Sequence, residues 1–200
     1  MNPLPEQGGS EDRPSGTSDS ESGVEIPEWA PIEPLPSSEM VLAAFAGMVP
    51  VTATDILDPA GEFVECQRQY RLALAVLSQT GASAEQMKEA AAELVSARSD
   101  IEMLIMVIDE SVADRLLRRR KDELRVRPVI PRAGTAPNVV VHTESVGMIA
   151  ARMADLWERL VAKASDLDEL PEAYQLCELC AAYDVFAAEI ESGRRLPPGL

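Results

Sequence analysis

SAEQMKEAAAELVSARSDIEMLIMVIDESVADRLLRRRKDELRVR, residues 83–127, is the stretch that decides the fold. It opens with Ser83 and, three residues later, Gln86, a capping box in which each side chain caps a backbone N–H of the other at a helix start. Apolar residues then recur every three or four positions, as on one face of a helix; they are Met87, Ala90, Leu94, Ala97, Ile101, Leu104 and Ile108. The pattern predicts one long helix from Ala84 to a point between Leu117 and Leu124.

That helix would be roughly 50–60 Å long, which exceeds the width of a small compact domain. We therefore expect it either to kink near residues 109–111 or to project past the helices that pack on it.

Two helices are expected before it. A short one should follow Ser37 or Ser38 and run to about Ala46. A second should begin at Asp58-Pro59, where an N-cap residue precedes proline at the first helical position, and should end at Gly81.

Two more helices are expected after it. One resumes beyond Asn138 or Thr143, and its apolar stripe is Val146, Ile149, Met153, Leu156 and Leu160. The last carries Leu176, Cys180, Tyr183, Ala187 and Ile190 and ends at Gly193. Residues 126–138 contain three prolines and a glycine and form an extended connection. Val139–Val141 is too short to seed a sheet alone, so the fold class is all-α, a helical bundle or long helical hairpin.

The N-terminal 36 residues have the composition of a disordered tail. They hold eight acidic residues against Arg13, a net charge of -7, with much Ser, Gly and Pro. The expected organisation is a tail at 1–36, a helical bundle at 37–193 and a frayed C-terminus at 194–200. Within the tail, Trp29, Ile32 and Leu35 alternate with Glu and Pro. This segment is either a solvated linker or a docking peptide for a groove on this protein or on another.

A basic cluster closes the long helix of a chain whose formal net charge is -16. Between Arg115 and Arg132 there are eight basic and two acidic residues. Three interpretations stay open: a nucleic-acid or phosphate contact, an electrostatic partner for the acidic tail or for another protein, and a solvated helix end. The overall negative charge and the lack of interleaved aromatic residues argue against nucleic acid. The candidate docking residues are Arg118, Arg119, Arg120, Lys121 and Arg125.

The cysteines and the single histidine are weak candidates for a metal site. Cys177 and Cys180 form a CxxC, but the pair lies within an expected helix and has no second pair. Cys66 and His142 are the other candidate ligands. Core packing is the expected role of the cysteines, and helix capping or surface exposure that of His142. We expect no metal, no cofactor and no catalytic residue, because no phosphate loop or nucleophile motif accompanies them.

The sequence has no apolar run of about 20 residues and no basic, then apolar, N-terminal segment. Three cysteines, an odd number, fit a reducing compartment. We therefore expect a cytoplasmic protein with no membrane contact.

Two stretches resemble a streptomycete family of small uncharacterised helical proteins that are often labelled natural-product biosynthesis proteins. One is residues 100–105, DIEMLI, with Val107 following. The other is residues 135–146, TAPNVVVHTESV, which leads to residues 156–160, LWERL. The resemblance covers roughly residues 90–160. It implies an all-helical fold and carries no catalytic residues.

The expected function is that of a non-enzymatic interaction protein, an adaptor, assembly or regulatory factor. The stripes Met87–Ile108 and Val146–Leu160 would be buried in a helical interface with a protein partner or with a second copy. The alternatives are nucleic-acid or phosphate binding through residues 115–132, and a small helical enzyme or metalloprotein.

Overall fold

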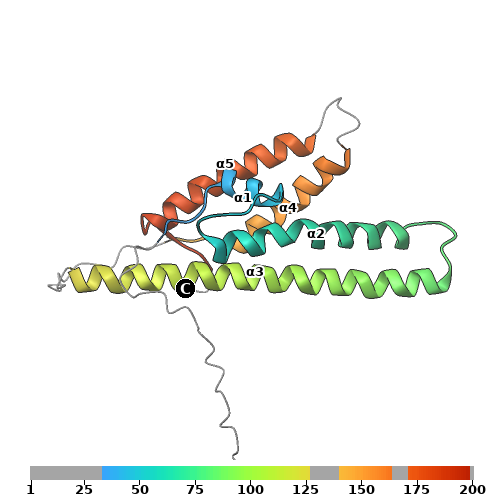
Figure 1. The fold of residues 1–200 in the computed structure, drawn as a ribbon, viewed down its shortest axis with the longest axis horizontal. Coiled ribbons are helices and arrows are strands. Elements are labelled where there is room, and N and C mark those ends of the chain that lie inside the picture. Colours follow the sequence, from blue (N-terminus) through green and yellow to red (C-terminus); the bar gives the residue numbers. More distant parts are fainter. Residues whose placement is uncertain (1–32, 127–139, 164–170, 199–200) are drawn as a thin grey trace, which may run out of the picture. The chain divides into compact units, whose positions relative to one another are not determined.

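The computed structural model describes residues 33–126, 140–163 and 171–198. Figure 1 shows the helices in chain order. They are α1 (Ser38–Phe45), α2 (Thr54–Leu77), α3 (Ala84–Val126), α4 (Val146–Lys163) and α5 (Pro171–Glu191). The prediction of an all-α fold is confirmed.

α2 and α3 form a long helical hairpin (Figure 1). The predicted capping box is present, since Ser83 N–H donates to Gln86 Oε1 at 2.9 Å and Gln86 N–H donates to Ser83 Oγ at 3.2 Å. The middle of the α3 stripe is buried where α2 runs beside it; the buried residues are Ala90, Ala97, Leu104 and Ile108. This stripe is thus largely occupied within the chain. α3 continues through residues 109–111 for 43 residues, about 65 Å, so it projects rather than breaks.

The predicted start of the second helix at Asp58-Pro59 is wrong, because α2 begins at Thr54 and contains Pro59. Ala53 precedes it in a left-handed conformation with φ of 50°. Ile56 and Leu57 are each 1% exposed, so burial draws the turn before the proline into the helix. Pro59 has no N–H to give to the carbonyl of Asp55, four residues earlier.

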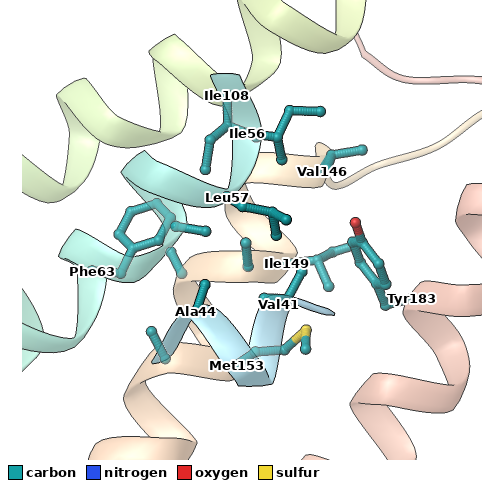
Figure 2. Close-up of a cluster of buried hydrophobic side chains, with 14 of the residues drawn as sticks. Val41, Ala44, Ile56, Leu57, Phe63, Ile108, Val146, Ile149, Met153 and Tyr183 are labelled. Atoms are coloured by element: carbon teal, nitrogen blue, oxygen red, sulfur yellow. The ribbon is translucent and has the colours of Figure 1, made fainter. Parts of the chain in front are cut away.

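The core lies where α1, α4 and α5 pack around the first half of α2. Figure 2 shows side chains from all five helices meeting there, among them Leu57, Phe63, Met153 and Tyr183. The stripe predicted for α4 supplies Val146, Ile149 and Met153 to this core, with Leu156 and Leu160 partly buried beside them.

α4 approaches α3 closely at its first turn. A Cβ at Gly147 would lie 2.6 Å from the carbonyl oxygen of Ile105, so only glycine fits. Asp109 Oδ1 accepts a hydrogen bond from Gly147 N–H at 2.8 Å. This carboxylate thus satisfies a free N–H at the start of α4.

The prediction of a frayed C-terminus at 194–200 is wrong for residues 195–197. Strands β1 (Val140–Val141) and β2 (Arg195–Leu196) pair in parallel, two residues each. His142 N–H extends the pairing to the carbonyl of Leu196 at 3.0 Å, and Pro197 is buried. Val140 and Val141 are therefore too few to form a sheet alone, but they pair with the segment that follows α5.

Among the described residues, no helix is both long enough and apolar enough to cross a membrane.

Candidate interaction surfaces

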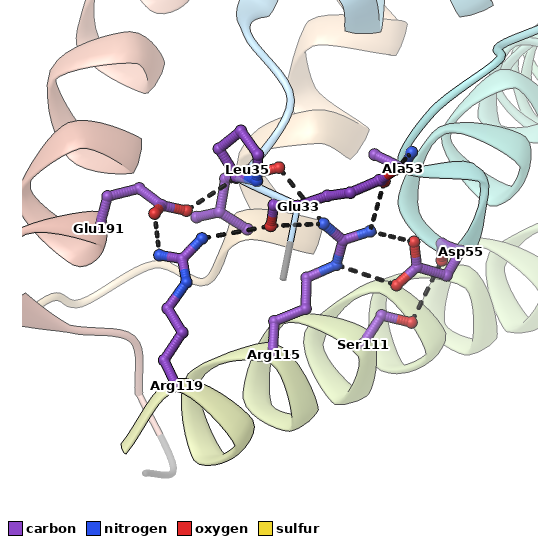
Figure 3. A network of polar contacts seen from close by, with 9 residues as sticks. Glu33, Leu35, Ala53, Asp55, Ser111, Arg115, Arg119 and Glu191 are labelled. Atoms are coloured by element: carbon purple, nitrogen blue, oxygen red, sulfur yellow. Dashed lines mark hydrogen bonds and ion pairs between the residues drawn. The ribbon is translucent and has the colours of Figure 1, made fainter. Parts of the chain in front are cut away.

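Arg115 lies at the centre of a polar network that ties α3 to the start of the described chain (Figure 3). Its guanidinium forms an ion pair with the carboxylate of Asp55, with Nε 3.1 Å from Oδ2. It also donates to the carbonyls of Glu33 and Pro34, at 3.0 and 3.3 Å. Only 11% of the Arg115 side chain is exposed, so the role of this arginine is structural.

Arg119 extends the network by one helical turn. It forms an ion pair with Glu191 at the end of α5 and donates to the carbonyl of Glu33 at 3.2 Å. The other carboxylate oxygen of Glu191 accepts a hydrogen bond from Leu35 N–H at 2.7 Å. α3 and α5 therefore hold the extended segment Glu33–Leu35 from both sides (Figure 3).

The boundary of the predicted tail moves from residue 36 to before residue 33. Leu35 is only 8% exposed, and Tyr183 Oη donates to the buried carbonyl of Pro36 at 2.9 Å. Of the three apolar residues of the predicted docking peptide, Leu35 thus packs against its own chain. Trp29 and Ile32 lie outside the described residues. Composition misplaced the boundary because the contacts that hold this segment come from α3 and α5, which lie far away in the sequence.

Three further residues of the basic cluster face solvent. Arg118, Arg120 and Lys121 are exposed, and among the described residues none of them forms an ion pair. Arg125 is in α3, and its side chain lies outside what the structure describes. The predicted cluster is thus divided, with Arg115 and Arg119 inside the polar network and three cations outside it.

The four candidate metal ligands do not form a site. Within residues 33–126, 140–163 and 171–198, no group of three His, Cys, Asp or Glu side chains could hold a metal ion. Cys66 and Cys180 are partly buried, and burial raises the pKa of both thiols. Cys177 is exposed, so the prediction that it packs in the core is wrong: its position on α5 faces away from the neighbouring helices.

His142 lies just before α4, but Ser145 supplies the capping hydrogen bond of that helix and His142 is partly buried, so the prediction of a capping or surface histidine is wrong. Its ring stacks on Phe186 with centroids 4.2 Å apart. The backbone N–H of Glu144 donates a hydrogen bond to His142 Nδ1 at 3.1 Å. The carbonyl oxygen of Glu144 lies 2.8 Å from the same Nδ1.

A cleft of 460 Å³ lies between α4 and α5. Two arginines line it, but Arg152 forms an ion pair with Glu144 and Arg159 with Asp155. Because both guanidinium groups already have carboxylate partners, the cleft offers little free positive charge to a ligand.

The largest feature that the sequence reasoning missed is a second apolar stripe on α3, which we call the outer face of α3. Its members and their exposed fractions are Val95 (69%), Met103 (51%), Met106 (62%), Val107 (40%) and Leu117 (47%). At 100° per residue Val95, Met103, Met106 and Leu117 point away from the buried stripe of Ala97, Leu104 and Ile108. Val107 lies at the edge of this face. The sequence does contain evidence of this face, because these apolar residues fall between the positions of the predicted heptad stripe.

Comparison of the whole chain with protein-family models, curated proteins and solved structures finds no match. The resemblance to a natural-product family therefore stays a prediction.

Proposed function

We propose that this protein is a non-enzymatic helical interaction protein, an adaptor, assembly or regulatory factor, that binds a protein partner through the outer face of α3. The observation that carries the proposal is the exposure of Val95, Met103 and Met106 on a helix whose opposite face is already packed. Exposed apolar side chains that gather along one face of a helix often mark the place where a protein partner binds.

The chemistry of this face suits a helical partner. Methionine side chains are flexible and polarizable, and they adapt to the surface they meet. Burying a large apolar side chain stabilises a complex by about 1.5–3 kcal/mol before the costs of association. Several such residues along one helix therefore supply a useful binding energy without any deep pocket.

The position of the face also supports the proposal. α2 packs along one side of α3 and α4 contacts it at Ile105 and Asp109, so the core of the domain does not depend on the outer face. A partner could bind and leave without unfolding the protein.

The test is affinity capture with the full chain from the cells that make it, followed by quantitative mass spectrometry. The variant is Met103→Glu with Met106→Glu, and the control is Val185→Glu on α5. Val185 is 61% exposed and Met106 62%, so the two substitutions alter equally exposed apolar positions on different helices.

The expected result is that at least one protein binds the wild type and the Val185→Glu control and is lost from the double variant. Circular dichroism should show the same helix content in all three. A set of captured proteins that is identical for wild type and double variant would exclude the outer face as the binding surface.

A further inference from the structure

We propose that the partner of the outer face of α3 is a second copy of this chain, bound with the two α3 helices antiparallel. This inference rests on the proposed function and names the partner of the same surface. The argument comes from the distribution of charge along α3.

The two ends of α3 carry opposite charges. Glu85, Glu89 and Glu93 lie in its first three turns, and Arg118, Arg120 and Lys121 lie near its other end. All six side chains are exposed, and within the described part of the chain none of them belongs to an ion pair. The protein thus displays two unpaired groups of opposite sign at the two ends of one apolar face.

The spacing puts the charges beside that face. Glu89 and Arg118 are 29 positions apart, close to eight whole helical turns, so they point the same way from α3. Glu93 and Lys121 fall within about one-sixth of a turn on either side of them. This side of the outer face carries Glu89 and Glu93 at its beginning and Arg118 and Lys121 at its end, with the exposed Asp114 one turn before Arg118.

An antiparallel pair brings like sides of two helices together, with their ends reversed. With a two-fold axis near Met103 and Met106, the segment Glu85–Glu93 of one copy lies along residues 116–124 of the other. The three glutamates of each copy then face the basic end of its partner, twice in the dimer. A parallel pair would instead turn this charged side toward the opposite side of the partner helix, so the glutamates of one copy would not meet the basic end of the other.

The apolar centre matches this arrangement. Val95 and Leu117 are 22 positions apart, about 33 Å along the helix, and Met103 and Met106 lie near the midpoint. In two copies related by the axis, the four central methionines lie together. Val95 of each copy then lies near the Leu117 end of the outer face of α3 in the other copy. Isologous contacts of this kind close on themselves and stop at a dimer.

A nucleic acid fits the same surface less well. A phosphate backbone would bind the basic end and be repelled by Glu85, Glu89 and Glu93 at the other. A surface that carries both signs around an apolar centre is complementary to itself.

The experiment is sedimentation equilibrium of the full chain over a thousandfold range of concentration. The wild type should form a dimer, and Met103→Glu with Met106→Glu should weaken it by more than about tenfold in dissociation constant. Val185→Glu should leave the dimer unchanged.

Charge exchange tests the orientation. Glu89→Lys with Glu93→Lys should weaken the dimer, and so should Arg118→Glu with Lys121→Glu. All four changes in one chain should restore it, because each reversed end again meets an opposite charge. In a parallel dimer the four-fold variant would remain as weak as its parents.

A wild type that stays monomeric at every concentration would overturn the inference, and so would a dimer that ignores the methionine substitutions or a four-fold variant that is not restored. A foreign protein captured by the wild type and lost from the methionine variant, with no dimer present, would overturn this inference while leaving the proposed function standing.

Discussion

The hydroxyl of Ser111 in α3 donates a hydrogen bond to the backbone carbonyl of Asp55 in α2, at 3.2 Å. That carbonyl lies four residues before Pro59, which has no N–H to offer it. A side chain of α3 thus replaces the backbone hydrogen bond that the Asp55 carbonyl cannot form within α2. The same residue, Asp55, also pairs through its carboxylate with Arg115, one turn further along α3.

Replacing Ser111 by alanine should destabilise the protein by about 1 kcal/mol, since the Asp55 carbonyl would lose its side-chain partner. The measurement is the free energy of unfolding in urea. Ser96→Ala is the matched control, because Ser96 is exposed on the same helix and shares the gain in helix propensity. Equal effects of the two substitutions would mean that the Ser111 hydroxyl contributes nothing to the hairpin.

Replacing Arg115 by alanine should cost about 2–3 kcal/mol, because it removes a charged donor from one carboxylate and two carbonyls. Arg118→Ala, at an exposed neighbour, should change stability by less than about 0.5 kcal/mol. The Arg115 variant should also speed amide hydrogen exchange at Leu35 and Ala53, whose N–H groups bind Glu191 and Glu33. Unchanged exchange there would show that the segment is held without Arg115.

The helices themselves followed from the sequence, because their signals are local. Ser83 and Gln86 form the capping box, and Gly47 and Gly193 take positive φ just beyond helix ends. The α4 stripe is buried too, but in the core of its own chain and not in the interface with a partner that was expected. The start of α2 was not predictable from local rules, since the proline rule is correct in isolation. Burial of Ile56 and Leu57 and the hydrogen bond from Ser111 are tertiary contacts, and they support a helix that runs through Pro59.

The surfaces were harder to predict than the helices. Seven arginines and lysines near the end of α3 look alike in sequence, yet Arg115 and Arg119 are bound inside the network while Arg118 faces solvent. Their separation depends on where residues 33–35 and the end of α5 lie, which no local pattern encodes. The outer face of α3 was missed because the stronger heptad stripe on the opposite face explained the periodicity.

Replacing Gly147 by alanine should destabilise the protein by about 1–3 kcal/mol, although alanine favours helices. The added Cβ would lie 2.6 Å from the Ile105 carbonyl oxygen and 3.0 Å from the Ile105 Cα, so α4 would have to move away from α3. Gly61→Ala is the control, because its Cβ would lie 3.3 Å from the nearest atom, the carbonyl oxygen of Ala44. Thermal unfolding of both variants measures the difference. A Gly147 variant at least as stable as the Gly61 variant would contradict the close approach of α4 to α3.

The three thiols should react at different rates with a disulfide reagent at neutral pH. Cys177 is exposed and should react fast, whereas burial raises the pKa of Cys66 and Cys180 and lowers their thiolate fraction. Absorbance of the released thiol should show one fast and two slow equivalents. Cys177→Ser should remove the fast phase alone, and a fast phase that persists in that variant would contradict the assignment.

Glu172 should make stability depend on pH. Its pKa is lowered, first by the hydrogen bond from Lys163, which joins the start of α5 to the end of α4. A carboxylate whose folded pKa lies below its unfolded value stabilises the fold above the unfolded pKa, about 4.3, and loses that contribution as the pH falls through the folded value. Glu172→Gln should therefore be less stable than the wild type at neutral pH, and the difference should shrink on acidification below about pH 4. Urea unfolding of both proteins at a series of pH values measures it, with Glu178→Gln, at an exposed position of α5, as the control. A difference between wild type and Glu172→Gln that stays constant across this range would show that the charge of Glu172, as opposed to its shape, has no part in joining the two helices.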